Sequence, residues 1–458
     1  MKTFLRTLAS VLLFSVLSTF CLWRHGAMPD LSNFTRFIHH MTVAGGQAIS
    51  AIKNGEDVAG AIATKARPVE SSDAYANYDL SEPLDPGLEN TICQGLTNMS
   101  AEIDISAYNL SPEAVSATIN QIRFSHPEFF YVGQEYQVGS FASKITTYRP
   151  QYMYNASTVA SMRATYQQKL NEITSGVPAG TTDFDKVLYL HNYFIRNYTY
   201  DYTYTIRDAY TLFTEKTGVC QAYMLGFIAA AGALGVESIP VTSQTMNHAW
   251  NLVKIDGSWY HMDVTWDDCM GIDTFVNYTY FLQSGNGLAG IDAGRPDGHR
   301  DWTTCRDADN SKYDSVIWRT SNAPLVKAGS TYYTALSVSS DERVARGVVY
   351  SGTDVTDLQP DFNITGGHWM AGTGSSYYTE CYSGLVVVDN RLYYNSGNTI
   401  YARDLTTGLV VYTYAPNLGA LGRSIYGMYG VTDGKVVFAA ATAPNDTNFI
   451  VMQCAAGI

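Results

Sequence analysis

The sequence predicts an α+β protein that is followed by an all-β region. The 458-residue chain is 46% hydrophobic, which is enough for sizeable cores and for two or three domains. Before about residue 312 the sequence is dominated by apolar runs with helical periodicity and contains one strong hairpin signal. After it, short alternating strands rich in Tyr, Val and Gly are separated by turn residues. The two parts therefore predict different architectures.

The N-terminal residues have the pattern of an export signal. Lys2 and Arg6 precede the apolar stretch 8–23, and Ala27 offers a cleavage position. The stretch is shorter than the roughly 20 residues that a membrane-spanning helix needs. We therefore expect 1–27 to be a cleaved signal peptide, with an uncleaved signal anchor as the alternative. Either would make the protein secreted or cell-surface bound, and it would contact the membrane only through this anchor.

Residues 28–87 are expected to form an N-terminal helix and a linker. The segment 33–66 has Ala-rich helical periodicity, and 67–87 mixes proline with serine and aspartate. Residues 88–185 have the pattern of several helices with some strand, and we expect them to pack onto the segment that follows. Together they make one predicted α+β domain, residues 88–311.

A cysteine lies at the start of the most apolar predicted helix. Residues 219–236 are almost wholly apolar and rich in helix formers, so Cys220 is expected in the first turn. Unpaired backbone N–H groups and the positive end of the helix dipole favour a thiolate at that position. Cys220 is therefore a candidate nucleophile. The alternative is a small buried hydrophobic residue, which is the commoner use of an isolated cysteine.

A β-hairpin is predicted to carry His248 and Asp263. Asp256-Gly257 is a two-residue turn signal, with the strand-like runs HAWNLVKI before it and SWYHMDVTW after it. A histidine or an aspartate in such strands is more often structural than functional. A functional role requires that the two side chains lie on the same face of the hairpin, which depends on the register of its strands.

The turn fixes the register of the two strands. If Ile255 pairs with Ser258, then His248 lies opposite Thr265, and Asp263 is the diagonal neighbour of His248 on the same face. Diagonal neighbours are about 7–8 Å apart between Cα atoms, which an imidazole and a carboxylate can bridge. A slip of one residue would turn Asp263 to the opposite face. The spacing therefore predicts a histidine that is held by a carboxylate.

At these residues the chain resembles the transglutaminase-like superfamily, whose core has a cysteine at a helix start and a histidine and an aspartate on neighbouring strands. The matching segments are 218–223 (GVCQAY), 247–251 (NHAWN) and 256–268 (DGSWYHMDVTWDD). The resemblance extends over roughly 86–310. It implies a papain-like α+β fold and thiol acyl chemistry for the predicted catalytic domain 88–311. It does not imply cross-linking, because the superfamily includes peptidases, deamidases, amidases and inactive relatives.

The resemblance and the spacing assign one role to each catalytic candidate. Cys220 attacks a carbonyl carbon, His248 transfers the proton and Asp263 orients His248. The backbone N–H of Cys220 is the expected first donor to the oxyanion, and no second donor can be named. No cofactor and no metal are predicted. Water or an amine can accept the acyl group, and hydrolysis is slightly favoured.

Composition limits the partners. The net charge of −13 and the 16% content of charged residues argue against nucleic acid and anionic membrane surfaces. We expect a protein or peptide substrate, with the peptides of cell walls as one candidate. The alternative is a catalytically silent surface adhesion or scaffold protein that binds a cell-wall polymer through its β region.

Other polar clusters are weaker candidates. Asp267, Asp268 and Asp273 suggest calcium, but the sequence has no EF-hand loop, so a solvated acidic turn is the better interpretation. His261 and His299 are interpreted as structural. The chain has no phosphate-binding glycine loop, no HExxH and no CxxC motif. These absences argue against nucleotide, zinc-protease and dithiol chemistry.

Cysteine pairing remains open at this point. The chain has 7 cysteines, and those outside the signal and the catalytic candidate form an odd set. Two bridges are suggested by position, Cys269 with Cys305 and Cys381 with Cys454, which would leave Cys93 unpaired. Buried free thiols are an equally favoured alternative.

Residues 312–458 are expected to form a separate all-β domain. The segment 385–414 has the pattern of one β-propeller blade, and 344–358 and 425–453 resemble fragments of two others. Three blades are too few to close a ring, so we expect a small β-sandwich or an open array of blades. A binding or wall-association role is expected for it rather than a second active site.

Overall fold

The computed structural model of the protein describes residues 80–458 apart from short gaps. The gaps are 142, 179, 269–275, 296–297, 322, 338–345, 366–369, 372–375, 378–383, 433–434, 443–449 and 456–458. The predicted signal at 1–27, the helix at 33–66 and the linker as far as residue 79 lie outside the described residues. Within the described part of the chain, no helix is both long and apolar enough to cross a membrane.

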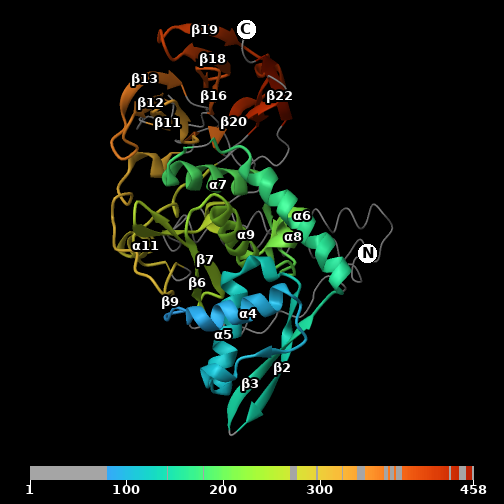
Figure 1. Cartoon of the computed structure of the whole chain (residues 1–458). Coiled ribbons are helices and arrows are strands. Elements are labelled where there is room, and N and C mark those ends of the chain that lie inside the picture. Colours follow the sequence, from blue (N-terminus) through green and yellow to red (C-terminus); the bar gives the residue numbers. More distant parts are fainter. Residues whose placement is uncertain are drawn as a thin grey trace, which may run out of the picture. The chain divides into compact units, whose positions relative to one another are not determined.

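Helices α4 (Pro86–Thr97) and α5 (Pro112–Ser125) open the described chain. Each begins with a proline and is capped by the side chain just before it, Asp85 or Ser111. A three-stranded antiparallel sheet in the order β1-β3-β2 belongs to the same part. Its strands are β1 (Ile103–Asp104), β2 (Val132–Phe141) and β3 (Lys144–Tyr152), the last two forming the long hairpin in Figure 1.

The middle of the chain is an antiparallel sheet packed on a buried helix. The sheet has the strand order β8-β7-β6-β9, and helix α9 (Cys220–Ala233) contacts β6 and β7 as well as helices α6, α7 and α8 (Figure 1). Because neighbours surround α9, an apolar sequence on all its faces is what its burial requires. The surrounding elements are α6 (Ala156–Thr174), α7 (Asp183–Asn197), α8 (Ala209–Glu215), β6 (Ser238–Ser243), β7 (His248–Ile255), β8 (Ser258–Met262) and β9 (Trp302–Thr303). This combination confirms the predicted α+β class.

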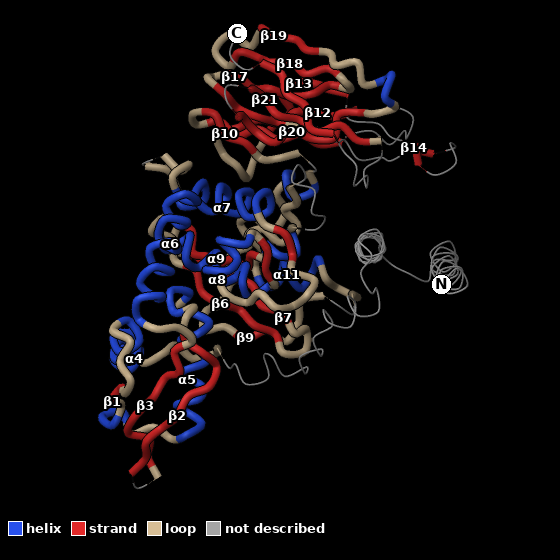
Figure 2. The backbone as a smooth tube through the Cα atoms, turned by 90° about the vertical axis from the view of Figure 1, so that its right-hand side faces the viewer, coloured by secondary structure: helices blue, strands red, loops and turns tan. Residues whose placement is uncertain are grey.

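The C-terminal part is built from strands, as predicted, and strands dominate it in Figure 2. Two four-stranded and one three-stranded antiparallel sheets follow one another along the chain. The first contains β10 (Val326–Ala328), β11 (Thr331–Ser337), β12 (Arg346–Gly352) and β13 (Gln359–Thr365). The second contains β16 (Leu385–Val388), β17 (Arg391–Ser396), β18 (Thr399–Asp404) and β19 (Val410–Tyr414). The third contains β20 (Ser424–Thr432), β21 (Lys435–Ala441) and β22 (Ile450–Ala455), and β14 (Met370–Ala371) pairs with β15 (Ser376–Tyr377).

The second sheet contributes to two cores because the side chains of a strand alternate between its faces. Tyr393 on β17 belongs to a core shared with β20 and β21, whereas Leu392 and Tyr394 belong to a core shared with β11 and β12. The three sheets are therefore packed in succession. This arrangement corresponds to the open array that the sequence offered as one of two possibilities.

The first of these sheets also packs against the α+β core. Tyr332 on β11 lies in the same hydrophobic cluster as α7 and α9, and its hydroxyl donates to Asp185 Oδ1 at 2.7 Å. Lys327 Nζ lies 2.6 Å from Asp185 Oδ2. Burial would raise the pKa of Asp185, but hydrogen bonds from Lys327, Thr182 and Tyr332 hold it below its usual value. The expected boundary at residue 312 is thus not a break in packing.

The four cysteines of the described chain, Cys93, Cys220, Cys305 and Cys454, are not joined in disulfides. The two suggested bridges, from Cys305 and from Cys454, are therefore not formed. Their suggested partners at positions 269 and 381 lie outside the described residues. For the described cysteines the alternative of free thiols holds.

Candidate active site

Cys220 is the first residue of α9, where the apolar run predicted it. Val219 is the N-cap residue, and no side chain caps this helix start. The chain before it is fixed by backbone pairing, since β4 (Thr199–Tyr200) lies parallel to β5 (Thr217–Gly218) and Val219 N donates to Ile206 O at 2.9 Å. Because the side chain of Val219 does not cap them, the N–H groups of this first turn can stabilise an anion, which favours a thiolate.

The hairpin has the predicted register. Ile255 pairs with Ser258 across the turn, and the ladder continues as far as Asn251 opposite Met262. The turn residues Asp256 and Gly257 both have positive φ, as a two-residue type I′ turn requires. Local turn chemistry therefore sets the pairing that the catalytic candidates depend on.

The second strand is shorter than predicted, and the expected pairing of Thr265 with His248 does not form. Strand β8 ends at Met262, and Val264–Asp267 form the short helix α10. Asp263 is the N-cap of that helix, and its Oδ1 accepts a hydrogen bond from Trp266 N at 3.1 Å. An aspartate in this position competes with strand extension because its side chain satisfies a helix donor.

The structure brings the three predicted residues together. His248 Nε2 lies 2.6 Å from Asp263 Oδ2, and both side chains are buried. The His248 ring also makes a hydrogen bond with the side chain of Cys220. Since Asp263 occupies Nε2, the ring's Nδ1 is the nitrogen left for the sulfur. The order of contacts is thus sulfur, imidazole, carboxylate.

The charges of this group stabilise one another. Burial would lower the pKa of His248, but the charges of Asp263 and Cys220 and their hydrogen bonds outweigh it and raise that pKa to about 10. Burial would likewise raise the pKa of Asp263, yet His248 and His299 hold it well below its usual value. The arrangement therefore favours a thiolate, an imidazolium and a carboxylate at neutral pH.

Two tryptophans flank the His248 ring. The ring stacks on Trp250 with centroids 5.5 Å apart and an interplanar angle of 24°. It also stacks on Trp266 at 5.3 Å and 29°. Stacked aromatic contacts restrict rotation of the ring. Trp250 and Trp266 thus help to hold the imidazole in the orientation in which it contacts both Cys220 and Asp263.

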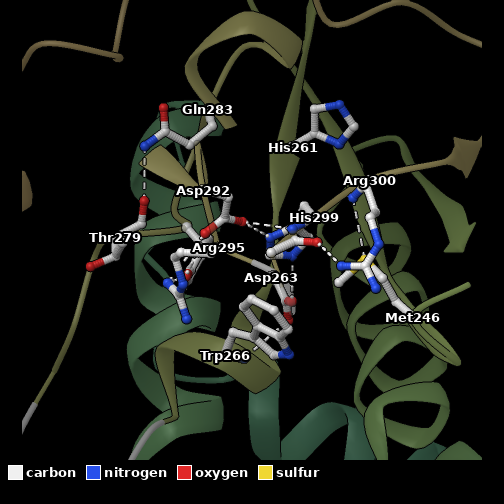
Figure 3. Close-up of polar contacts among 12 residues, drawn as sticks. Met246, His261, Asp263, Trp266, Thr279, Gln283, Asp292, Arg295, His299 and Arg300 are labelled. Carbon is white, nitrogen blue, oxygen red and sulfur yellow. Dashed lines mark hydrogen bonds and ion pairs between the residues drawn. The ribbon is translucent and has the colours of Figure 1, made fainter. Parts of the chain in front are cut away.

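His299, which the sequence suggested was only structural, lies in the site. Its Nε2 is 3.0 Å from Asp263 Oδ2, and its Nδ1 is 2.6 Å from Asp292 Oδ2 (Figure 3). It comes from a loop 36 positions beyond Asp263, and no periodicity or turn signal connects the two. The sequence carried no signal that could have found this contact.

His261 is structural, as expected. Its Nδ1 accepts a hydrogen bond from Trp250 Nε1 at 3.1 Å, and burial followed by the charge of His299 lowers its pKa to about 3. A neutral ring with a lone pair toward the indole is consistent with this contact.

The interpretation of Asp267 and Asp268 as a solvated acidic turn is wrong. Asp267 is fully buried, its Oδ2 lies 3.1 Å from His191 Nε2, and its Oδ1 accepts from Tyr280 N at 3.0 Å. Asp268 accepts a hydrogen bond from Tyr223 OH at 2.6 Å. Both carboxylates bind partners within the protein rather than solvent, which explains the difference. The third acidic residue, at position 273, lies outside the described residues.

A tyrosine loop, defined as residues 200–204 (YDYTY), adjoins the helix start. Tyr200 pairs with Gly218, two residues before Cys220, and the rings of Tyr202 and Tyr204 lie 5.2 and 6.3 Å from its own. Burial and then the charge of Cys220 raise the pKa of Tyr200, so its phenol is close to the sulfur. Tyr202 and Tyr204 are 40% and 56% exposed.

The loop is rigid because the Asp201 carboxylate organises it. This buried side chain accepts hydrogen bonds from Thr203 N and Thr205 N, both at 2.8 Å, and from Ile206 N at 2.9 Å. A carboxylate that satisfies three backbone donors fixes the turn around it. The exposed rings of Tyr202 and Tyr204 therefore have a defined position near Cys220.

Comparison with known proteins agrees with this geometry. The profile of the transglutaminase-like superfamily matches residues 167–264, which include all three predicted catalytic positions. No protein of curated function matches the chain. Among solved structures, a TGase is 14% identical over 30% of this chain and 45% of its own, with a TM-score of 0.21. A Cytophaga hutchinsonii protein described as a cysteine protease is 15% identical over 29% of this chain and 61% of its own, with a TM-score of 0.19.

These two structures are too distant to add to the account of the site, and this chain spans less than two thirds of either. The profile match rests on the segment that supplies α9, the hairpin and Asp263. Over residues 167–264 the chain is similar to the transglutaminase-like superfamily.

Proposed function

We propose that the protein is an exported cysteine enzyme with a papain-like catalytic core that cleaves or transfers the acyl group of a peptide amide. The observation that supports this most directly is the position of His248, which bonds to Cys220 through one ring nitrogen and to Asp263 through the other. A nucleophile, a base and an orienting carboxylate in that order make up a thiol acyl-transfer site.

The proposed reaction begins with attack of the Cys220 thiolate on the carbonyl carbon of the amide. A C–S bond forms and the carbonyl π electrons move to oxygen, giving a tetrahedral oxyanion. The His248 imidazolium then gives its proton to the amide nitrogen, the C–N bond breaks and the amine leaves. The acyl group remains on Cys220 as a thioester.

The second half returns the thiol to its starting state. His248, now neutral, takes a proton from water, whose oxygen attacks the thioester carbonyl. The C–S bond breaks, the carboxylic acid leaves, and Cys220 and His248 are again an ion pair. An amine in place of water would give transfer instead of hydrolysis. The triad itself encodes no preference between these acceptors, and we favour water slightly.

The oxyanion needs donors at the helix start. The backbone N–H of Cys220 is the first donor we propose, since no side chain caps α9 there. The phenol of Tyr200, close to the sulfur on β4, is our candidate for the second. A neutral phenol can donate a hydrogen bond to an oxyanion, and the raised pKa of Tyr200 keeps it protonated at neutral pH.

The tyrosine loop supports a peptide as the substrate. Tyr202 and Tyr204 offer exposed aromatic surface beside Cys220, held in place by Asp201. The net charge of −13 disfavours polyanionic substrates. We therefore propose a neutral or cationic peptide, with cell-wall peptides as one candidate.

Thiol reactivity tests this proposal directly. Iodoacetamide at neutral pH should label Cys220 much faster than Cys305, a partly exposed thiol outside the site, as read by mass spectrometry of tryptic peptides. Cys93 should first be replaced by Ser, because its sulfur lies 3.6 Å from His126 Nε2 and is not a neutral reference. Labelling of Cys220 that is no faster than that of Cys305 would favour the scaffold alternative.

A further inference from the structure

We infer that His299, held by Asp292, is a positioning residue for the proposed reaction, which fixes the Asp263 carboxylate in the orientation that His248 needs. The inference rests on the proposed function, because it concerns the same catalytic group. It adds two residues that neither the sequence pattern nor the family match includes, since residues 167–264 end before both.

Asp263 is fixed by three donors. Its Oδ2 faces His248 Nε2 at 2.6 Å and His299 Nε2 at 3.0 Å, while its Oδ1 accepts from Trp266 N at 3.1 Å. Both carboxylate oxygens are engaged, Oδ2 by the two histidines and Oδ1 by Trp266 N, so the carboxylate cannot turn without breaking a contact. Asp263 and His299 are both at least 95% buried, at 1% and 5% exposure. Water therefore cannot replace a lost donor cheaply.

His299 is fixed in turn by Asp292. The ring Nδ1 lies 2.6 Å from Asp292 Oδ2, and the backbone N of His299 donates to the same oxygen at 2.8 Å. Asp292 Oδ1 accepts from Arg295 Nη1 at 3.2 Å (Figure 3). It also accepts from Tyr280 OH at 3.2 Å. Four donors thus surround one carboxylate, and the imidazole can take only one orientation.

Both ring nitrogens of His299 face a carboxylate oxygen. Nδ1 contacts Asp292 Oδ2 and Nε2 contacts Asp263 Oδ2. The His299 ring therefore links the Asp263 carboxylate to the Asp292 carboxylate, and its position depends on both.

The contact has a consequence for His248. Asp263 Oδ2 faces both His248 Nε2 and His299 Nε2, so His299 helps to fix the oxygen that orients the His248 ring. Tyr280 also contacts Asp263, but its backbone oxygen accepts from the backbone N of Asp263 at 3.1 Å and not from the carboxylate. His299 is therefore the side chain that holds Asp263 Oδ2 in place for His248.

A metal centre is the competing explanation, since His248, Asp263 and His299 place ligand atoms within 4.8 Å of one another. Two ligands of a tetrahedral zinc ion at 2.0–2.1 Å are separated by roughly 3.3 Å. The 2.6 Å between His248 Nε2 and Asp263 Oδ2 is shorter than this and fits a charge-assisted hydrogen bond. The geometry favours protons over a metal ion.

The test compares the pH dependence of Cys220 alkylation by iodoacetamide in the full chain, in a Cys93→Ser background, with His299→Gln and Asp292→Asn. Rates are measured from about pH 3 to about pH 9, and thermal unfolding shows which variants are folded. Because Asp263 stabilises the imidazolium that accompanies the Cys220 thiolate, a less firmly held Asp263 carboxylate should move the acid limit of the profile upward by about one pH unit in His299→Gln. Asp292→Asn should move it in the same direction by less.

His261→Gln is the matched control, because it removes an equally buried imidazole that touches Trp250 but not Asp263. Its profile should keep the wild-type limit. An unchanged limit in folded His299→Gln, or in Asp292→Asn if that variant alone folds, would overturn the inference. Stoichiometric zinc in the purified wild type that is lost in His299→Gln would overturn it in favour of a metal centre. Slow alkylation of wild-type Cys220 at every pH would instead refute the proposed function.

Discussion

His248 and Asp263 meet at 2.6 Å although only one of them belongs to a strand. His248 begins β7, and Asp263 lies just beyond β8, as the N-cap of α10. The same carboxylate thereby ends the strand, starts the helix with its Oδ1 and binds the imidazole with its Oδ2. One side chain performs a structural and a proposed catalytic role, which makes its replacement informative.

We expect Asp263→Asn to lower kcat/KM on a peptide substrate by about 10²–10⁴-fold. The amide has no negative charge to stabilise the imidazolium, and its NH₂ group can face a ring N–H. The hydrolysis rate of a labelled peptide mixture would measure the loss. Asp256→Asn provides the control, because this exposed turn residue has positive φ, which asparagine tolerates well. Equal activity of both variants would contradict the role given to Asp263.

The His248 ion pair predicts how stability depends on pH. Its pKa is raised to about 10 in the folded protein, so its stabilising effect is fully present below about pH 6.5 and is lost as the pH rises through about 10. The difference in free energy of unfolding between the wild type and His248→Gln should therefore shrink over that interval. Denaturant unfolding at several pH values would measure it. A difference that stays constant from neutral pH to about pH 10 would show that the pair is not charged.

Gly218 is predicted to be essential for the position of Cys220. A Cβ added there would lie 2.7 Å from Ala222 Cβ and 3.1 Å from Leu212 Cδ1. Gly218→Ala should cost about 1–3 kcal/mol of stability, because the start of α9 must shift. Gly232 lies within α9, and nothing lies within 4 Å of a Cβ added there. Gly232→Ala should therefore stabilise the protein by about 0.5–1 kcal/mol. Thermal unfolding of the two variants would show whether the signs are opposite.

The tyrosine loop predicts a separation of binding from thiol reactivity. If Tyr202 and Tyr204 contact the substrate, their joint replacement by Ser should raise KM several-fold and leave the alkylation rate of Cys220 near the wild-type value. Tyr154→Ser is the control, since Tyr154 is 43% exposed and lies outside the loop. A fall in kcat at unchanged KM would argue that the loop supports the triad rather than the substrate.

Where local chemistry decides the structure, the sequence was sufficient. The apolar run from residue 219 placed Cys220 at a helix start, and Asp256-Gly257 set the register of the hairpin. Both features depend on residues within a few positions of one another. The alternation of short strands likewise predicted the C-terminal sheets.

Tertiary packing decided the rest. Contact between His299 and Asp263 joins segments 36 positions apart, so that its formation depends on how a loop folds over the sheet. The end of β8 was mispredicted because strand propensity continues to Trp266, whereas the Asp263 carboxylate finds a helix donor. Asp267 was assigned to solvent because its sequence neighbours are acidic, but its partners His191 and Tyr280 come from other elements. A buried polar side chain needs a hydrogen-bonding partner, and the tertiary fold determines which residue that partner is.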